Sequence, residues 1–397
     1  MTMRERGPGK EGTSFASGVS DATGTALAEP QAQGELDSSV GVSMWAIVLA
    51  GGIGSRFWPL SSPDRPKQLL PLVNDRPLIA DTIARLYPLI PPERVLVLTS
   101  RDIASAIHAR IPEVPGANVL AEPRPLGTAA SLAWGASEIA RRAGPKTVFC
   151  CLHADLAVAF PDALRFALRR AAIIASRDSV LVALGATPTR NDTSFGYLLP
   201  GESLDSTSPL AEGGAAHVTT FREKPDAEAA LRLIADGAYW NTGIFVWEAG
   251  EVLEQMADLT PEIAPGLASL RRNDVDAFAE EIDSISLERG LLERTSDLVM
   301  LPTDCGWDDV GTWACLRRSR ELDDDGNGAM GPAHFVDATS NIVHAEHGQV
   351  VLYGVHKLLV VSLHGITFVT TLDRARDLKP LLDQLPGSLR LRSGKRK

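Results

Sequence analysis

Glycines and positively charged residues gather in one short stretch of this sequence, residues 46–72, AIVLAGGIGSRFWPLSSPDRPKQLLPL. Its first five residues (46–50) form an apolar run that is typical of a buried parallel strand. Three closely spaced glycines follow directly, and glycine lets backbone N–H groups approach a ligand closely. These are Gly51, Gly52 and Gly54. With Arg56 and Lys67 a short distance further on, the stretch predicts a phosphate-binding loop suited to a nucleoside triphosphate.

The spacing excludes two common phosphate-binding loops. A Walker A loop, G-x-x-x-x-G-K-[ST], needs a glycine followed by Lys and then Ser or Thr. No glycine of this stretch is followed by that pair of residues. A dinucleotide fingerprint, G-x-G-x-x-G, would need a third glycine where Phe57 stands. What remains is G-G-x-G-x-R-x-W-P-L, followed by P-K-Q.

The composition of the whole chain narrows the class of protein. The 397 residues are 44% hydrophobic, which supports a sizeable core, and 39 basic against 50 acidic residues give a net charge of -11. That charge disfavours binding to nucleic acid or to an anionic membrane, so we expect neither partner. Four cysteines without metal-ligand spacing are expected to be buried small residues, and no apolar run reaches the ~20 residues of a membrane span. A cytoplasmic location is therefore expected.

Apolar strands and amphipathic helices alternate after Trp45. We expect strands at 94–99, 119–121, 147–152 and 179–185, and helices at 78–89, 103–111, 129–142 and 161–177. Such βα repeats predict an α/β fold, a Rossmann-like, mostly parallel mixed sheet flanked by helices. Ligands then bind at the carboxyl ends of the strands. Further on, we expect strands at 195–199, 217–222 and 244–247 and helices at 227–236 and between 249 and 279.

Changes in composition divide the chain into three parts. Residues 1–43 have almost no large apolar side chains, so we expect a disordered N-terminal tail, with Met44 as an alternative start. Residues 44–328 are expected to form the catalytic domain. Acidic and glycine residues at 323–328 mark its end. Residues 329–397, with short strands, a helix near 375–385 and a basic tail, are expected to form a small β-rich C-terminal domain, which offers a surface for a homodimer.

The glycine-rich pattern resembles the sugar-1-phosphate nucleotidylyltransferases. With Trp58, Ser61 and Pro66-Lys67-Gln68, it is most similar to the mannose-1-phosphate guanylyltransferases of that family, and the resemblance covers roughly Trp45 to Leu385. It implies transfer of GMP from GTP to α-D-mannose 1-phosphate, giving GDP-mannose and pyrophosphate. Arg56 and Lys67 would then be catalytic, and the glycines would bind the nucleotide.

Two distant carboxylates are the candidate ligands of a magnesium ion, which nucleotidyl transfer needs to neutralise phosphate charge. Asp155 follows the expected strand 147–152, at the edge of the sheet where ligands bind. Residues 306–313 resemble the family's G-W-x-D-V-G-S-W segment, which implies that Asp309 is the second ligand. Each aspartate could instead cap a helix, Asp155 the one near Pro161 and Asp309 the one near Thr312.

Three further segments resemble the family's acceptor-sugar site. Residues 221–225 resemble F-V-E-K-P, which implies that Lys224 binds the sugar phosphate and Glu223 the sugar hydroxyls. Residues 240–245 resemble W-N-S-G-M-F, with Asn241 on the sugar, and Gly196-Tyr197 resembles a G-Y segment beside it. Tyr197 and Trp240 could instead be ordinary core residues.

Two segments depart from the family pattern and leave the substrates open. Bacterial guanylyltransferases of this type usually show G-R-N-T-A-P where this chain has residues 125–130, PLGTAA, so Gly127 and Thr128 are predicted nucleotide contacts without a settled base. Residues 284–294 match the family's S-I-D-Y-A-V-M-E-K only loosely, with Ser286 at the acidic position. The alternatives are another sugar phosphate or base, such as glucose 1-phosphate with UTP, and a non-catalytic, nucleotide-sensing homologue.

Overall fold

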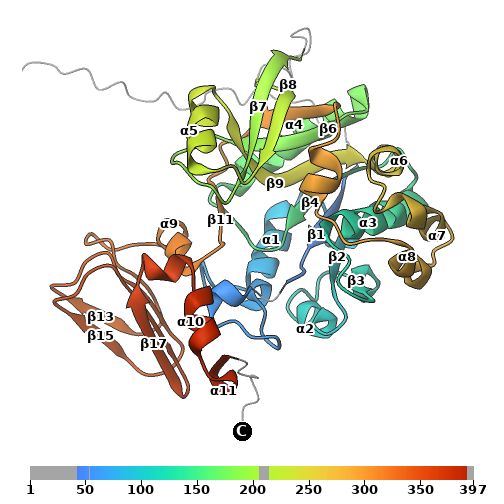
Figure 1. Ribbon diagram of the computed structural model, residues 1–397. Coiled ribbons are helices and arrows are strands. Elements are labelled where there is room, and N and C mark those ends of the chain that lie inside the picture. The colour runs from blue at the N-terminus through green and yellow to red at the C-terminus, as the bar shows by residue number, and fades with distance from the viewer. Residues whose placement is uncertain (1–42, 53, 205–213, 391–397) are drawn as a thin grey trace, which may run out of the picture. The chain divides into compact units, whose positions relative to one another are not determined.

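A nine-stranded mixed sheet forms the centre of the larger part of the chain (Figure 1). The computed structural model describes residues 43–390 except Ile53 and 205–213. The strand order is β3-β2-β1-β4-β9-β6-β10-β8-β7, and only β8 and β9 run against the other strands of this sheet. The strands are β1 (Trp45–Leu49), β2 (Val95–Ser100), β3 (Val119–Glu122), β4 (Val148–His153), β6 (Leu181–Ala186), β7 (Gly196–Ser203), β8 (Ala216–Glu223), β9 (Tyr239–Glu248) and β10 (Leu298–Pro302). The predicted α/β class is confirmed.

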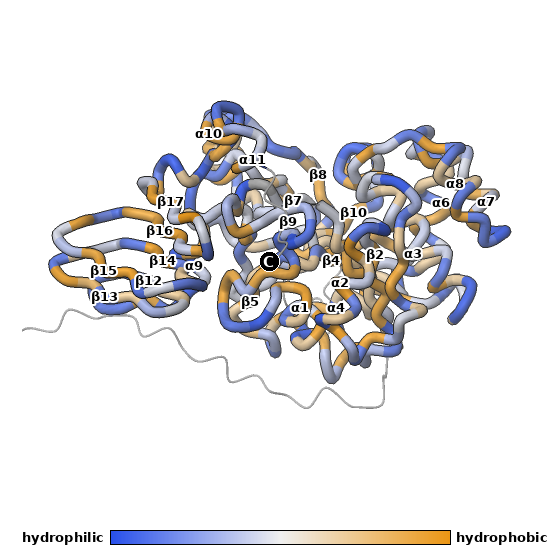
Figure 2. Tube along the Cα trace, turned by 90° about the horizontal axis from the view of Figure 1, so that it is seen from below, coloured by the Kyte–Doolittle hydropathy of each residue, from blue (hydrophilic) through white to orange (hydrophobic). Residues whose placement is uncertain are grey.

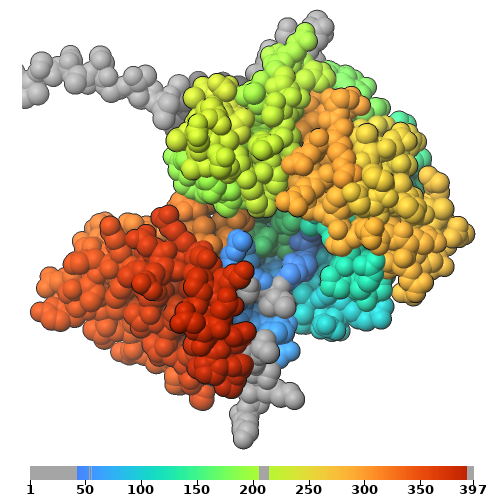
Figure 3. Space-filling view, in the orientation of Figure 1, coloured from blue at the N-terminus to red at the C-terminus, as the bar shows by residue number. Residues whose placement is uncertain are grey.

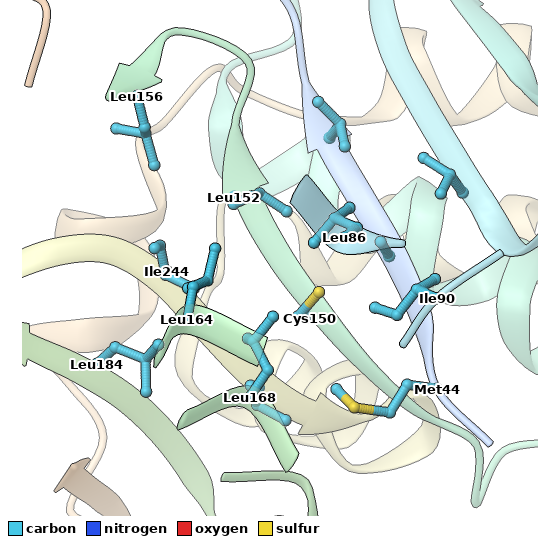
Figure 4. Packing of buried hydrophobic residues seen from close by; sticks show 14 of the residues in the cluster. Met44, Leu86, Ile90, Cys150, Leu152, Leu156, Leu164, Leu168, Leu184 and Ile244 are labelled. Carbon is cyan, nitrogen blue, oxygen red and sulfur yellow. The ribbon is translucent and has the colours of Figure 1, made fainter. Parts of the chain in front are cut away.

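Helices cover both faces of this sheet because the strands are apolar on both sides. Ala46 and Val48 of β1 face one hydrophobic cluster, and Ile47 and Leu49 face the other, as expected for side chains that alternate along a strand. The first cluster, part of which Figure 4 shows, is covered by α1 (Leu78–Leu86), α2 (Ala104–His108) and α4 (Pro161–Asp178). The second is covered by α3 (Thr128–Ala143), α6 (Ala249–Leu259), α7 (Leu267–Arg271) and α8 (Val275–Glu281).

Several predicted elements differ in extent from those observed, and three of the differences have a local cause. The helix expected at 78–89 ends at Leu86, because Pro88 disfavours a helical backbone at Tyr87 before it. The helix expected at 103–111 is limited to α2, and Pro112 follows it. The strand expected at 244–247 is the longer β9, whose first half pairs with β7 and the end of β6. Its polar residues, Asn241 and Thr242, hid that half from an apolar pattern.

The C-terminal residues form stacked β-coils, as Figure 1 shows at the red end of the chain. β12 (Gly328–Met330), β14 (Ile342–Ala345) and β16 (Leu358–Leu363) pair in parallel, and β17 (Ile366–Thr371) closes this sheet. β13 (Ala333–Val336) and β15 (Val350–Tyr353) form a second parallel pair. The short helices α10 (Lys379–Gln384) and α11 (Gly387–Arg390) follow. The predicted β-rich region is confirmed, and Figure 2 shows hydrophobic and hydrophilic residues interleaved along it.

The β-coils share one hydrophobic core with the segment that follows the glycines. Phe57, Trp58 and Trp313 pack in the same cluster as Ile342 and Val361. All described residues accordingly belong to one compact unit, and the domain boundary between 328 and 329 stays a prediction. The expected tail at 1–43, apart from Ser43, and the end of the basic tail lie outside the described residues. No helix in the described part of the chain has the length and apolarity needed to cross a membrane.

Close packing of α3 on the sheet gives a test of the fold. A Cβ at Gly135 would lie 2.6 Å from Ile47 Cδ1, so a larger side chain must displace the core of the central strand. We expect Gly135→Val to lower the free energy of unfolding by about 1–3 kcal/mol in urea titrations. Ala143→Val, at an exposed position of the same helix, is the control and should change it by under about 1 kcal/mol. Equal effects of the two would contradict this packing.

Candidate active site

The glycine loop begins directly after β1 and adopts a backbone that needs glycine. Gly52 and Gly54 have φ angles of 91° and 69°, in the left-handed region. A Cβ at Gly54 would lie 2.4 Å from Cβ of Lys67, so glycine is also required for Lys67 to pack against the loop. Ser61 Oγ donates a hydrogen bond to the Gly54 carbonyl at 2.8 Å. Gly54 is therefore held against Lys67 and Ser61.

The strand end that carries the loop is fixed by two side chains. Gln68 Nε2 and Thr99 Oγ1 both donate to the carbonyl oxygen of Ala50, at 2.7 and 3.0 Å. All three residues are buried, so these bonds satisfy polar groups that water cannot reach. Gln68 belongs to the P-K-Q motif, whose structural role is thus to join that segment to β1.

A separate two-stranded sheet brings the two predicted metal ligands together. β5 (Leu156–Val158) and β11 (Trp307–Asp309) pair antiparallel, with Asp309 opposite Leu156. Asp155 precedes Leu156, so this register places the two aspartates next to each other although they are far apart in the sequence. The predicted proximity of the two carboxylates is observed.

Lys67 is the positive charge at this pair of carboxylates. Its Nζ lies 2.8 Å from Asp155 Oδ2, and its ammonium group lies over the Phe57 ring. Burial would raise the pKa of Asp155, but Lys67 and then His153 hold it below its usual value. Burial raises the pKa of Asp309. The positive charge of Lys67 opposes this rise, and the negative charge of the neighbouring Asp155 increases it. Asp155 therefore carries the firmer negative charge of the two.

Neither aspartate caps a helix, so the competing interpretation is wrong. The residue before α4 is Phe160, and no side chain caps that helix. Thr312 precedes the short helix at Trp313–Cys315, again without a side-chain cap. Both carboxylates are thus left for ligand chemistry.

The carboxylate pair fits a hard divalent cation. Magnesium commonly takes one or two carboxylates and completes its shell with substrate phosphates and water. In residues 43–390 as described, no group of three or more His, Cys, Asp or Glu side chains could hold a metal ion. Asp155 and Asp309 can therefore supply two oxygen ligands, and the remaining ligands would have to come from a bound phosphate and from water.

Arg56 and Gly311 complete this end of the site. Arg56 is exposed, in the short helix Ser55–Phe57, and forms no ion pair with any described residue. A Cβ at Gly311 would lie 2.4 Å from Asp309 Oδ2 and 3.9 Å from Arg56 Nη1. Because Gly311 has no side chain, the Asp309 carboxylate can occupy this space, close to the Arg56 guanidinium.

A cavity of about 1180 Å³ opens beside the loop, and Figure 3 shows a hollow next to the red C-terminal segment, with blue residues at its floor. Its walls include all three glycines of the loop, Arg56, and the residues Ser61 to Asp64. The C-terminal segment contributes Asp377, Leu378, Lys379, Leu382, Asp383 and Arg390. The volume suits a ligand of nucleotide size.

The predicted acceptor residues form a second group, on β7 and β8. Gly196 pairs with Glu223, and a Cβ at Gly196 would lie 2.7 Å from Glu223 Oε2. Lys224 has a φ of 45° and places Nζ 2.5 Å from Glu223 Oε1. Burial raises the pKa of Glu223 even though Lys224 opposes the rise. An ammonium and a partly buried carboxyl group therefore lie side by side, as recognition of a sugar phosphate would need.

Tyr197 and Trp240 are core residues, whatever else they do. Tyr197 is fully buried, and its hydroxyl donates to the Asp192 carbonyl at 2.9 Å. Trp240 lies opposite it in the sheet. Asn241 Oδ1 accepts a hydrogen bond from Gly243 N at 3.1 Å. Direct contact of Tyr197 or Asn241 with a sugar stays a prediction.

Gly127 and Thr128 hold another segment of the chain. Gly127 has a φ of 89°, and a Cβ there would lie 2.6 Å from the Ile285 carbonyl oxygen. Thr128 Oγ1 accepts a hydrogen bond from Leu287 N at 2.8 Å. The loosely matching segment 284–294 is therefore placed by these two residues, and their contact with a nucleotide stays a prediction.

Four charged or titratable side chains near the site were not predicted from the sequence. His153 lies close enough to both aspartates to lower their pKa values, and its Cδ2 is 3.3 Å from where Gly243 would carry a Cβ. Asp308 forms ion pairs with Arg318 and Arg190. The position of Asp308 next to Asp309 in the sequence could have pointed to it. Nothing in the sequence pointed to Arg190 or Arg318.

Comparison with known proteins identifies the family. Residues 45–325 match the family described as Nucleotidyl transferase. The chain belongs to this family. Its relatives place it among the sugar-1-phosphate nucleotidyltransferases, so the resemblance read from the motifs is confirmed and the chain is an enzyme of that family.

Relatives of this nucleotidyltransferase cover most of the chain. A mannose-1-phosphate guanylyltransferase of Escherichia coli K12 is 31% identical over 358 residues, 86% of this chain and 73% of the relative. The xanthan biosynthesis protein XanB of Xanthomonas campestris pv. campestris B100 is 31% identical, over 85% of this chain and 72% of the relative. A Thermus thermophilus structure described as a mannose-1-phosphate geranyltransferase is 31% identical with a TM-score of 0.76, covering 86% of this chain and 99% of the other.

The space at Gly311 gives a test of the carboxylate arrangement. In Gly311→Ala the new methyl group must displace the Asp309 carboxylate, and the φ of this residue adds no strain of its own. We expect a loss of about 10-fold or more in Mn²⁺ affinity, measured by calorimetry, with little change in thermal stability. Gly387→Ala, where a Cβ meets no atom within 4 Å, is the control. Unchanged Mn²⁺ affinity would exclude Asp309 as a ligand.

Proposed function

We propose that this nucleotidyltransferase transfers GMP from GTP to α-D-mannose 1-phosphate, releasing pyrophosphate and forming GDP-mannose. The observation that carries the proposal is the convergence of Lys67, Asp155 and Asp309 beside the glycine loop. It supplies a buried cation and two carboxylates at the edge of the sheet where a triphosphate would lie. The choice of GTP and mannose 1-phosphate is supported by the names of relatives about 30% identical over most of the chain.

The reaction needs little covalent help from the protein. A phosphate oxygen of the sugar phosphate, already ionised near neutral pH, attacks the α-phosphorus and forms the new P–O bond. The bond from the α-phosphorus to the oxygen that bridges the α- and β-phosphates breaks, and pyrophosphate leaves with the electron pair. Catalysis then depends on positioning the two substrates and on stabilising the charge that develops.

Each charged group has a role that follows from its surroundings. Lys67 is buried between loop and carboxylates, which suits a fixed charge at the α-phosphate. Arg56 is exposed at the cavity wall, which suits the departing pyrophosphate. Lys224 extends from a strand end and can follow the phosphate of the acceptor during reaction. Glu223 would accept hydrogen bonds from the sugar hydroxyls.

Asp155 and Asp309 are the groups proposed to hold magnesium. Enzymes of this kind generally use a divalent metal. When bound, the ion supplies positive charge that offsets the negative charge of the reacting phosphates. In the proposal, Lys67 keeps Asp155 ionised and oriented, and Gly311 leaves room for the carboxylate of Asp309. We also propose a cytoplasmic location. Its reducing environment is consistent with the four cysteines, none of which forms a disulfide.

A substrate panel tests the proposal directly. Pyrophosphate release is measured with each of four nucleoside triphosphates against mannose, glucose and other sugar 1-phosphates. We expect the highest kcat/KM for GTP with mannose 1-phosphate. A preference for UTP with glucose 1-phosphate would overturn the substrate assignment and leave the reaction class standing. Tight GTP binding without turnover of any pair would favour a nucleotide-sensing homologue.

Removal of the buried cation tests the catalytic assignment. Lys67→Met keeps the length of the side chain and removes the charge, so the developing charge on the α-phosphate loses its nearest stabilising group. We expect kcat to fall on the order of 10²- to 10³-fold in steady-state assays with saturating Mg²⁺. Lys357→Met, the same change at an exposed lysine of the β-coils, is the control and should retain full activity. Normal turnover in Lys67→Met would show that the assignment is wrong.

A further inference from the structure

The guanidinium of Arg190 lies between the acceptor group and the metal-ligand strand. Its Nε lies 2.9 Å from Asp192 Oδ2, and its Nη2 lies 3.7 Å from Asp308 Oδ1. Its Cζ lies 4.6 Å from the centroid of the Trp240 ring and 5.4 Å from that of Phe195. Stacking on aromatic rings and pairing with carboxylates are both strong arginine interactions. One side chain thus contacts β9, β11 and the turn before β7.

On the metal side, Arg190 and Arg318 hold the same carboxylate. Arg318, in α9 (Leu316–Ser319), binds Asp308 with two hydrogen bonds, of 2.5 and 3.0 Å. Asp308 precedes Asp309 in β11, and successive side chains of a strand point to opposite faces. β11 is only three residues long, so its orientation depends on such contacts. Fixing Asp308 on one face therefore fixes Asp309 on the other, toward Lys67.

On the acceptor side, Arg190 holds the turn that leads into β7. Asp192, its closest ionic partner, exchanges backbone hydrogen bonds with the Tyr197 hydroxyl at 2.9 and 3.3 Å. Tyr197 of β7 pairs with Trp240 of β9. Their sequence neighbours Gly196 and Asn241 are predicted to bind the sugar. A displacement of this turn would therefore act on Arg190.

The contact from Arg190 to Asp308 is close to a hydrogen bond without being one. Nη2 of Arg190 is buried and has no hydrogen-bond partner among the described residues. A buried donor without a hydrogen-bond partner is unfavourable. A shift of less than about 1 Å would bring Nη2 within hydrogen-bond distance of Asp308. Arg190 therefore joins the acceptor-side turn to β11 through one short ionic contact, to Asp192, and one longer one, to Asp308.

We propose that Arg190 is a positioning residue, which couples the acceptor-side wall to Asp309 through Asp308. It orients the second metal ligand when the sugar phosphate is seated against β7 and β9, and it contacts no reacting atom itself. This inference rests on the proposed function, because it takes Asp309 as a ligand of the divalent ion. It adds three residues, Arg190, Asp308 and Arg318, that no motif of the family marks in this chain.

Direct Mn²⁺ binding to the full chain, followed by electron paramagnetic resonance with saturating mannose 1-phosphate and no nucleoside triphosphate, tests the coupling. We expect the dissociation constant to rise about 10-fold in Arg190→Met and in Asp308→Asn, the range found for groups that orient metal ligands. The double variant should bind no more weakly than Asp308→Asn alone, because that change already breaks the link to Arg190. Arg294→Met removes an equally well-paired arginine, bound to Glu262 at 2.8 Å, and should leave Mn²⁺ binding unchanged.

Steady-state kinetics separates positioning from simple packing. Arg190→Met should lower kcat and raise the KM for the sugar phosphate, each by about 10-fold, with the KM for the nucleotide unchanged. Arg190→Lys should lose less activity than Arg190→Met, because lysine keeps the positive charge. It should not reach wild-type activity, because lysine lacks the planar guanidinium group. Additive effects of Arg190→Met and Asp308→Asn, or Mn²⁺ binding equal to wild type in both, would overturn the inference.

Asp309→Ala distinguishes failure of this inference from failure of the proposed function. If Asp309→Ala weakens Mn²⁺ binding and the Arg190 and Asp308 variants do not, the coupling is wrong and the metal assignment stands. If Asp309→Ala has no effect, the metal assignment fails and the inference fails with it. Thermal unfolding of each variant shows whether it is folded, and Asp308→Asn, which keeps the size of the side chain, gives a second measurement if Arg190→Met is unstable.

Discussion

The site depends on one buried ammonium group and the carboxylates that compensate it. Lys67 is only 7% exposed, and a buried charge without a partner is strongly unfavourable. Asp155, 2.8 Å away, supplies the direct partner, and Asp309 adds negative charge from β11, which is distant in the sequence. Folding must therefore bring the glycine loop, β5 and β11 together. The carboxylates that compensate Lys67 are the groups proposed to bind the metal ion, and Lys67 itself is the charge proposed to face the triphosphate.

The β-coils stabilise the site from behind. Trp313 Nε1 donates to the Trp58 carbonyl at 3.0 Å, and Trp58 Nε1 donates to the carbonyl of Leu389 at 3.1 Å. Trp58 also packs edge-on against Phe368, with ring centroids 5.1 Å apart. Because Trp58 follows the glycine loop by only a few residues, the C-terminal segment anchors the backbone from which Arg56 projects. The segment after β17 thus forms a wall of the cavity, and the strands before it support that segment.

The two groups of site residues are built on different parts of the sheet. The loop and Asp155 follow parallel strands at their carboxyl ends, where such sheets bind ligands. The acceptor group lies on β7, β8 and β9, where the antiparallel pairs begin. Arg190 and His153 lie where these regions meet: Arg190 reaches Asp308 and Trp240, and His153, at the end of β4, lies beside Gly243 of β9. In our proposal, this junction transmits the binding of the sugar phosphate to the metal ligand Asp309.

Sequence alone determined the local features of this protein. Apolar runs located the parallel strands, and the positions of Gly51, Gly52 and Gly54 located the loop, because positive φ angles and close approach restrict the residue type. Motif spacing identified the family and pointed to Lys67, Asp155 and Asp309. Elements without an apolar signal were missed, such as the first half of β9, whose polar residues are buried by pairing with β7.

Tertiary structure alone decided which residues act together. The register of β5 with β11, the packing of Gly311 against the Asp309 carboxylate, and the Arg190 contacts all join segments distant in the sequence. A lone arginine or histidine in a sequence has no preferred partner, because a long-range ion pair leaves no periodicity and needs no fixed spacing. Helix capping by Asp155 and Asp309 was equally compatible with the sequence, and only the observed helix starts excluded it.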